Sequence, residues 1–166
     1  MLPAHRRYIY AEQGLGCAVV TALINAGIAW LLLGGRTGLP LWGSVSTAGD
    51  VLSTAFLLPL LVCLIITLQT RRAVASGRFP ALEIPDSLLS WMPWIPASAR
   101  QRSVRLAVAG FVLVGLPTTL LLVVLHPEPM EASMFIVFKA VFAGLFAGLL
   151  GPLVARIALA DSRSHG

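Results

Sequence analysis

Residues 48–70 read AGDVLSTAFLLPLLVCLIITLQT, a run of 23 residues in which Asp50 is the one charged side chain. An α-helix rises about 1.5 Å per residue, so about 20 apolar residues are enough to cross the hydrocarbon core of a bilayer. Three other stretches have similar length and composition: residues 14–34, 104–126 and 132–158. The sequence therefore predicts an all-α integral membrane protein in which residues 1–166 form a single domain, a four-helix bundle.

The composition excludes a water-soluble globular domain. Hydrophobic residues make up 57% of the chain and charged residues 11%, whereas about a quarter of the residues of an ordinary soluble domain are charged. A chain of 166 residues cannot bury that much apolar surface from water. The first apolar stretch is longer than the roughly 7–15 apolar residues of a secretory signal, so we expect a retained helix.

The arginines indicate which ends of these helices face the cytoplasm. Cytoplasmic loops of membrane proteins are enriched in Arg and Lys. Ten of the eleven arginines lie near the N-terminus, in or beside the segment 71–103, or near the C-terminus, whereas Arg36 shares the opposite side with Glu128 and Glu131. We therefore predict cytoplasmic termini, short outer loops, one longer cytoplasmic loop at about 71–103, and a location in a bacterial inner membrane. Because the arginines flank apolar runs and form no basic patch, no nucleic-acid partner is expected.

Three tryptophans are predicted to anchor the protein at the membrane surface. Trp42 lies in a short outer loop, and Trp91 and Trp94 lie in the cytoplasmic loop among prolines. Tryptophan is enriched at the boundary between lipid and water. The cytoplasmic loop either lies on the inner leaflet or docks a protein partner.

Lys139 and Asp50 are the principal candidates for a functional site. Lys139, the one lysine of the chain, lies about 7 residues into the last apolar stretch, roughly 10 Å from its outer end. Charges inside the bilayer are costly and therefore mark functional positions. Lys139 either extends toward the surface or pairs with Asp50, near the outer end of the second stretch. Thr47-Ala48-Gly49-Asp50 also matches a capping box, in which Asp50 has a local role.

Other polar side chains are expected at the same depth as this pair. They come from the first three apolar stretches, while the inner half of the bundle is expected to be mainly aliphatic. Such residues either join helices through hydrogen bonds or line a polar pocket open to the outside. The predicted intramembrane site comprises Lys139, Asp50, Asn25, Ser53, Thr54, Thr118 and Thr119.

A ridge of small residues in the last apolar stretch predicts close helix packing. Gly144, Gly148 and Gly151 follow the small-xxx-small pattern of membrane helix interfaces. At about 100° per residue, Gly144 and Gly148 lie nearly opposite Lys139 around the helix. If Lys139 faces the interior of a square bundle, the ridge faces a second subunit, and we expect a homo-oligomer, with a dimer favoured. Packing within one chain is the alternative.

The function that these features favour is transport or solute binding. No nucleotide-binding loop, catalytic triad or Cys/His metal pattern is present in the sequence, so no enzyme activity, cofactor or metal is expected. An anion is the natural ligand for Lys139 where Asp50 leaves it unpaired. The alternative is a non-catalytic accessory subunit that docks on a larger membrane complex, using the glycine ridge and the Trp-containing loop.

Overall fold

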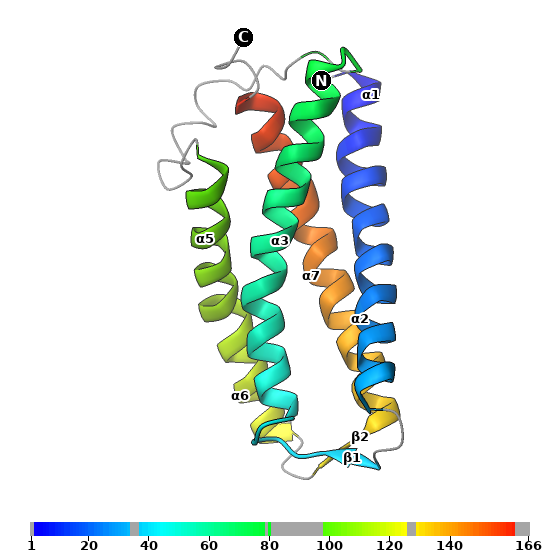
Figure 1. Ribbon diagram of the computed structural model, residues 1–166, viewed down its shortest axis with the longest axis vertical. Coiled ribbons are helices and arrows are strands. Elements are labelled where there is room, and N and C mark those ends of the chain that lie inside the picture. Colours follow the sequence, from blue (N-terminus) through cyan, green and yellow to red (C-terminus); the bar gives the residue numbers. More distant parts are fainter. Residues whose placement is uncertain (1, 34–36, 79, 81–97, 126–128, 162–166) are drawn as a thin grey trace.

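The computed structural model describes residues 2–33, 37–78, 80, 98–125 and 129–161, which are almost entirely helical (Figure 1). We call Pro3–Leu33 the first long helix and Ala99–Leu125 the third long helix, because each combines several consecutive elements. In chain order the elements are α1 (Pro3–Arg6), the π-helical segment η1 (Arg7–Gly16), α2 (Cys17–Leu33), β1 (Gly38–Leu39), α3 (Thr47–Ala75), α5 (Ala99–Gly110), the π-helical segment η2 (Phe111–Gly115), α6 (Leu116–Leu125), β2 (Met130–Glu131) and α7 (Ala132–Asp161).

The four expected helices are confirmed within these described residues, and each is long and apolar enough to cross a membrane. They contain between 27 and 31 residues, whereas about 20 suffice to span the hydrocarbon core. Large apolar side chains such as Leu31, Leu113 and Leu149 are more than 70% exposed. A surface of this kind is compatible with lipid as the surrounding solvent.

The first long helix begins at Pro3, well before the apolar stretch that was predicted from residue 14. Its additional turns carry polar residues that pack against the rest of the bundle, with Tyr8 and Gln13 buried. The helix is therefore longer than a bilayer crossing requires, and tertiary packing supports its additional turns.

The helices run alternately up and down, so that the bundle has two distinct ends (Figure 1). The end at which Pro3, Ala75, Ala99 and Asp161 lie is called the arginine end below. At the opposite end, called the β end, β1 and β2 form a short antiparallel pair in which Gly38 opposes Glu131 and Leu39 opposes Met130.

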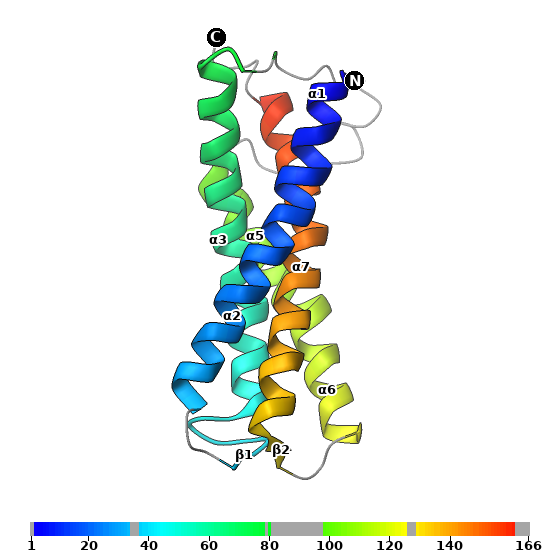
Figure 2. The same cartoon turned by 90° about the vertical axis from the view of Figure 1, so that its right-hand side faces the viewer.

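The helices pack in a row and not in a square. α7 packs against the first long helix and against α3, and α3 in turn packs against the third long helix. Figure 1 shows this order across the bundle, and Figure 2 shows the first long helix crossing in front of α7. α7 and α3 are therefore the central pair, and each is covered on two faces by helices of the same chain.

This arrangement corrects the predicted role of the glycine ridge. A Cβ atom added to Gly144 or Gly148 would lie about 3 Å from Ala22 or Ala18 of α2, and one on Gly151 would lie 1.8 Å from the carbonyl oxygen of Gln13. The ridge is therefore the face on which α7 packs against the first long helix of its own chain. The expectation that it faces a second subunit is wrong because the bundle is not a square. The oligomeric state itself stays a prediction.

We predict that Gly151→Ala destabilises the bundle, because its methyl group would overlap the Gln13 carbonyl and force the backbones of α7 and η1 apart. Overpacking of this kind costs about 1–3 kcal/mol of the free energy of unfolding. Gly27→Ala is the matched control, because no atom lies within 4 Å of its added Cβ. Unfolding of both variants in mixed detergent micelles measures the difference; an unchanged Gly151→Ala variant contradicts the close approach.

Candidate functional site

Asp50 is positioned by the way in which α3 begins. Ser46 is the N-cap, and its side chain accepts a hydrogen bond of 3.2 Å from the amide of Gly49. The amide of Thr47 donates to the carbonyl of Pro40. The predicted capping box, with Thr47 as the cap, is therefore wrong by one residue, and the Asp50 side chain has no capping role.

The Asp50 carboxylate instead pairs with Lys139 across the interface of α3 and α7. The ammonium Nζ of Lys139 donates to Oδ1 of Asp50 at 2.5 Å. The Lys139 side chain is 7% exposed and that of Asp50 is 27% exposed. The ring of Phe135, one turn earlier on α7, lies with its centroid 6.0 Å from the ammonium. Lys139 thus turns sideways toward α3 and does not extend along α7 to the β end.

The pair retains unused hydrogen-bonding capacity. An ammonium has three donors and a carboxylate has two acceptor oxygens. Among the described residues, Asp50 is the one hydrogen-bond acceptor for Lys139, and Oδ2 of Asp50 receives no hydrogen bond. Two N–H groups and one oxygen therefore stay available to a ligand or to water, although the charges of the pair cancel.

Two pockets meet at this ion pair. One, of about 280 Å³, opens at the β end, where the turn before α3 contributes Ser44 and Ser46. The other, of about 410 Å³, lies on the side of the bundle between α2 and α3. Asp50, Ser53 and Lys139 line both pockets. The pair is therefore reached from the end of the bundle and from its side.

Five of the seven predicted site residues come together in the side pocket. Asn25 and Thr54 line it together with the three shared residues. Asn25 donates from Nδ2 to the carbonyl of Thr21, and Ser53 donates to the carbonyl of Gly49. Asn25 and Ser53 thus each have a partner within their own helix and still border the pocket.

Thr118 and Thr119 line neither of these two pockets. They belong to α6 of the third long helix, which packs against α3. Thr119 is buried, and no partner for its hydroxyl is present in the described part of the chain. The structure therefore does not bring them to the pair, because equal positions along the helices do not place the helices side by side.

Of the three tryptophans predicted to anchor the protein at the membrane surface, one lies within the described residues. Trp42 is 59% exposed at the β end, where an interfacial side chain is expected. Trp91 and Trp94, with most of the predicted cytoplasmic loop, lie outside the described residues.

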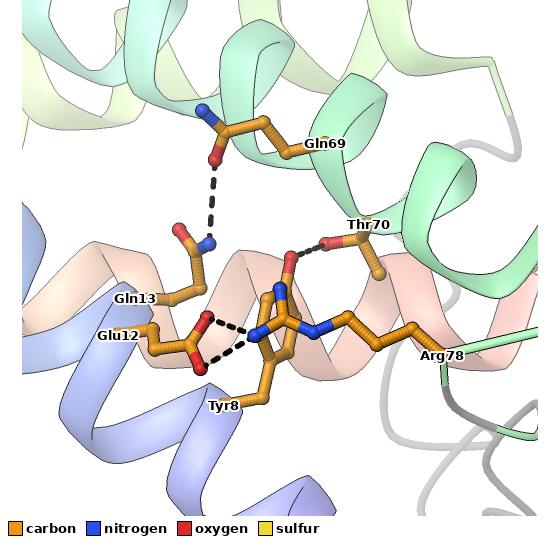
Figure 3. Close-up of polar contacts among 6 residues, drawn as sticks. All are labelled: Tyr8, Glu12, Gln13, Gln69, Thr70 and Arg78. Atoms are coloured by element: carbon orange, nitrogen blue, oxygen red, sulfur yellow. Dashed lines mark hydrogen bonds and ion pairs between the residues drawn. The ribbon is translucent and has the colours of Figure 1, made fainter. Parts of the chain in front are cut away.

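A second polar cluster lies at the arginine end, between the first long helix and α3 (Figure 3). The Tyr8 hydroxyl and the Thr70 hydroxyl form a buried hydrogen bond of 2.9 Å. Gln13 donates to Gln69 at 3.3 Å, and Arg78 donates to Glu12 at 3.0 Å. A pocket of about 460 Å³ adjoins this cluster, with Arg72 and Ser76 in its wall.

A buried arginine joins the third long helix to α3 and α7 near the same end. Arg102 is 1% exposed, donates to Asp161 of α7 at 2.5 Å, and donates to the Thr67 hydroxyl at 3.3 Å. The Asp161 carboxylate and the Thr67 hydroxyl thus accept hydrogen bonds from two nitrogens of this buried guanidinium.

These groups form a polar network at the arginine end, and the expectation of a mainly aliphatic inner half stays a prediction. Sequence reasoning missed these groups because it began the first helix near residue 14 and the third near residue 104, which left Tyr8, Glu12 and Arg102 outside the helices. The signal was present in Tyr8 and Gln13, polar residues just before the first apolar stretch, which contact Thr70 and Gln69 respectively (Figure 3).

No family model, curated protein or solved structure matches the chain. Within the described stretches, no three His, Cys, Asp or Glu side chains gather as a metal site requires. The function is therefore argued from the two polar clusters and the pockets beside them.

We predict that Asp50 and Lys139 are energetically coupled. Lys139→Met or Asp50→Asn alone leaves a charge without its partner, which costs several kcal/mol when it is fully buried. Because Asp50 is partly exposed, we expect about 1–3 kcal/mol for each single variant and less than their sum for the double variant. Unfolding in mixed micelles measures all three.

The exposed pair Glu12–Arg78 provides the control for this cycle. Its side chains are 36% and 55% exposed, so Glu12→Gln and Arg78→Gln should show a coupling below about 1 kcal/mol. Additive effects of Asp50→Asn and Lys139→Met would mean that the buried pair does not form.

Proposed function

We propose that this protein is a transport-type or solute-binding membrane protein whose ligand binds at the Asp50–Lys139 pair. The observation that carries the proposal is a charged pair, with unused donors and an unused acceptor, where two pockets meet. Ionisable residues inside a membrane protein are expensive, face cavities or one another, and mark the path of a substrate. The proposal includes no catalytic step.

The pairing changes the class of ligand that the site favours. An isolated lysine would attract an anion, but Asp50 cancels the charge of Lys139 at 2.5 Å. A simple anion would gain an attraction to Lys139 and suffer repulsion from Asp50 of similar size. The site therefore favours a ligand that carries both a hydrogen-bond donor for the carboxylate and an acceptor for the ammonium.

The proposal places the β end on the outer side of a bacterial inner membrane and both termini in the cytoplasm. Support comes from the positive-inside rule. The arginines of the described residues gather toward the arginine end, where they lie on the last or first turns of the long helices or in the segments that follow them: Arg6, Arg7, Arg71, Arg72, Arg78, Arg100, Arg102, Arg105 and Arg156. Glu131 lies at the β end.

The second polar cluster supports a transport role over simple binding. The first long helix and α3 both pack on α7, and the groove between them is called the seam. The Asp50–Lys139 site and the Tyr8 cluster lie toward opposite ends of this seam. Transporters bind substrate between helices that open alternately to the two sides. Polar groups at both ends of one helix seam are the arrangement that such opening would use.

The second proposal is that the protein is an accessory subunit of a larger membrane complex. The exposure of the first long helix supports it. Only 6% of its most apolar window is buried within the chain, which leaves a long face for a partner. Purification in mild detergent separates the two proposals, because a stoichiometric second protein supports the accessory role and a preparation of this chain alone opposes it.

We predict that Ser53→Cys, with Cys17→Ala and Cys63→Ala, reacts with a charged, membrane-impermeant thiol reagent added to intact cells. Ser53 is exposed and lines both pockets, so water from the outer side should let its thiol ionise and react. Protein mass after the reaction measures the labelling.

Leu120→Cys in the same background is the matched control. Leu120 lies five residues from the β end of α6 and is 65% exposed on the side of the bundle, so lipid should surround its thiol and keep it unreactive. Equal labelling of the two variants, or none at Ser53→Cys, opposes an outward-facing polar site.

A further inference from the structure

We propose that the ligand is an amino-phospholipid of the surrounding bilayer, with its zwitterionic headgroup at Asp50–Lys139 and one acyl chain in the seam between α2 and α3. The inference rests on the proposed ligand site and names its substrate class. It combines the charge of the pair, the shape of the side pocket and the depth of both in the membrane.

The side pocket has a polar end and an apolar remainder. Near the pair its wall carries Asn25, Ser53 and Thr54. Away from the pair, toward the arginine end, α3 contributes Leu57, Leu61 and Ile65, one turn apart and each about half exposed. Asp50 and Ile65 are 15 residues apart, or about 22 Å along a helix, which exceeds the roughly 15 Å of hydrocarbon in one leaflet. The seam is long enough for one acyl chain.

The pair lies at the depth of lipid headgroups. α7 has 30 residues and is about 45 Å long, so it extends about 7 Å beyond each side of a centred hydrocarbon core about 30 Å thick. Lys139, about 10 Å from the β end of α7, is then within a few ångströms of the boundary between headgroups and acyl chains. A lipid headgroup reaches this position without crossing the hydrocarbon.

The charges of the pair complement a phosphate and a primary amine. The two unused N–H groups of Lys139 suit phosphate oxygens, and the unused Oδ2 of Asp50 suits an ammonium N–H. A phosphatidylglycerol headgroup has the phosphate and lacks the cation. A phosphatidylcholine headgroup has a cation without N–H groups. Phosphatidylethanolamine supplies both partners, and the pocket of about 280 Å³ at the β end has room for its headgroup.

The test measures which lipids stay bound to the full-length protein. Purified protein is equilibrated with mixed micelles that contain equal amounts of phosphatidylethanolamine, phosphatidylcholine and phosphatidylglycerol, and native mass spectrometry counts the retained lipids. We expect phosphatidylethanolamine to bind roughly tenfold more tightly than the other two, which is the effect of one charge-assisted hydrogen bond. Equal retention of the three lipids overturns the inference.

Two tryptophan substitutions separate the seam from the general lipid surface. Leu61→Trp should fill the apolar part of the seam and abolish the preference for phosphatidylethanolamine. Leu120→Trp, on the exposed face of α6, should leave the preference unchanged. A preference that survives Leu61→Trp, or that Leu120→Trp removes equally, overturns the inference even where variants of the charged pair fail to fold.

A soluble headgroup distinguishes failure of this inference from failure of the proposed site. Glycerophosphoethanolamine has the phosphate and amine without acyl chains, and in micelles free of added lipid it should slow the labelling of Ser53→Cys only weakly. Phosphatidylethanolamine should slow the labelling roughly tenfold without abolishing it, because a bound lipid exchanges, so that the thiol still reacts in intact cells. Strong protection by the soluble compound with no effect of the lipid keeps the site and rejects the lipid. A Ser53→Cys thiol that stays unreactive in micelles without phosphatidylethanolamine rejects both.

Discussion

A lysine ammonium enclosed by apolar helices requires an opposite charge nearby, and this requirement fixes how the two central helices of the bundle face one another. Lys139 finds its partner in Asp50, and the contact joins α7 to α3, the two central helices. Removing either charge from water is unfavourable, and their mutual attraction offsets that cost only when the two groups are held close together. The start of α3 at Ser46 provides this placement, because it leaves the carboxylate free of any capping role.

The row of helices explains how α7 carries two different faces. Lys139 points toward α3, while Gly144, Gly148 and Gly151 lie against the first long helix. Small residues allow the backbones on the glycine face to approach closely, which gives extensive van der Waals contact between the two helices. The polar pair on the other face is thereby held against α3 by packing behind it. The same row leaves the seam between α2 and α3 open on its side, where the pocket lies.

The four helices were readable from the sequence because a helix that can cross a bilayer must have a certain length and polarity. Apolar runs of about 20 residues, bounded by arginines, identified all four helices. Position along each helix was readable as well, since each residue adds about 1.5 Å, and the structure places Asp50, Lys139, Asn25, Ser53 and Thr54 around one pocket. The neighbour that each helix face contacts was not readable, because it depends on how the helices are arranged. For that reason Thr118 and Thr119 were grouped with a pair that they do not approach.

The polar groups at the arginine end escaped prediction for a different reason. Hydropathy marks where a helix enters hydrocarbon and not where it ends, and η1 continues for a further turn or more with Tyr8, Glu12 and Gln13 on it. The capping residue was misplaced because Ser46 and Thr47 are both good N-caps. Only the loop carbonyls of Pro40 and Leu41, which accept from the first amides of α3, decide between them. These carbonyls come from a part of the chain whose position no local pattern reveals.

The central claim is that Asp50 and Lys139 neutralise one another inside the bundle, and exchanging their charges tests it most directly. Asp50→Lys alone places two cations together and should unfold the protein or lower its stability strongly in mixed micelles. Adding Lys139→Asp restores an ion pair of opposite sense and should recover most of the lost stability. A double variant that is no more stable than Asp50→Lys alone would contradict the account.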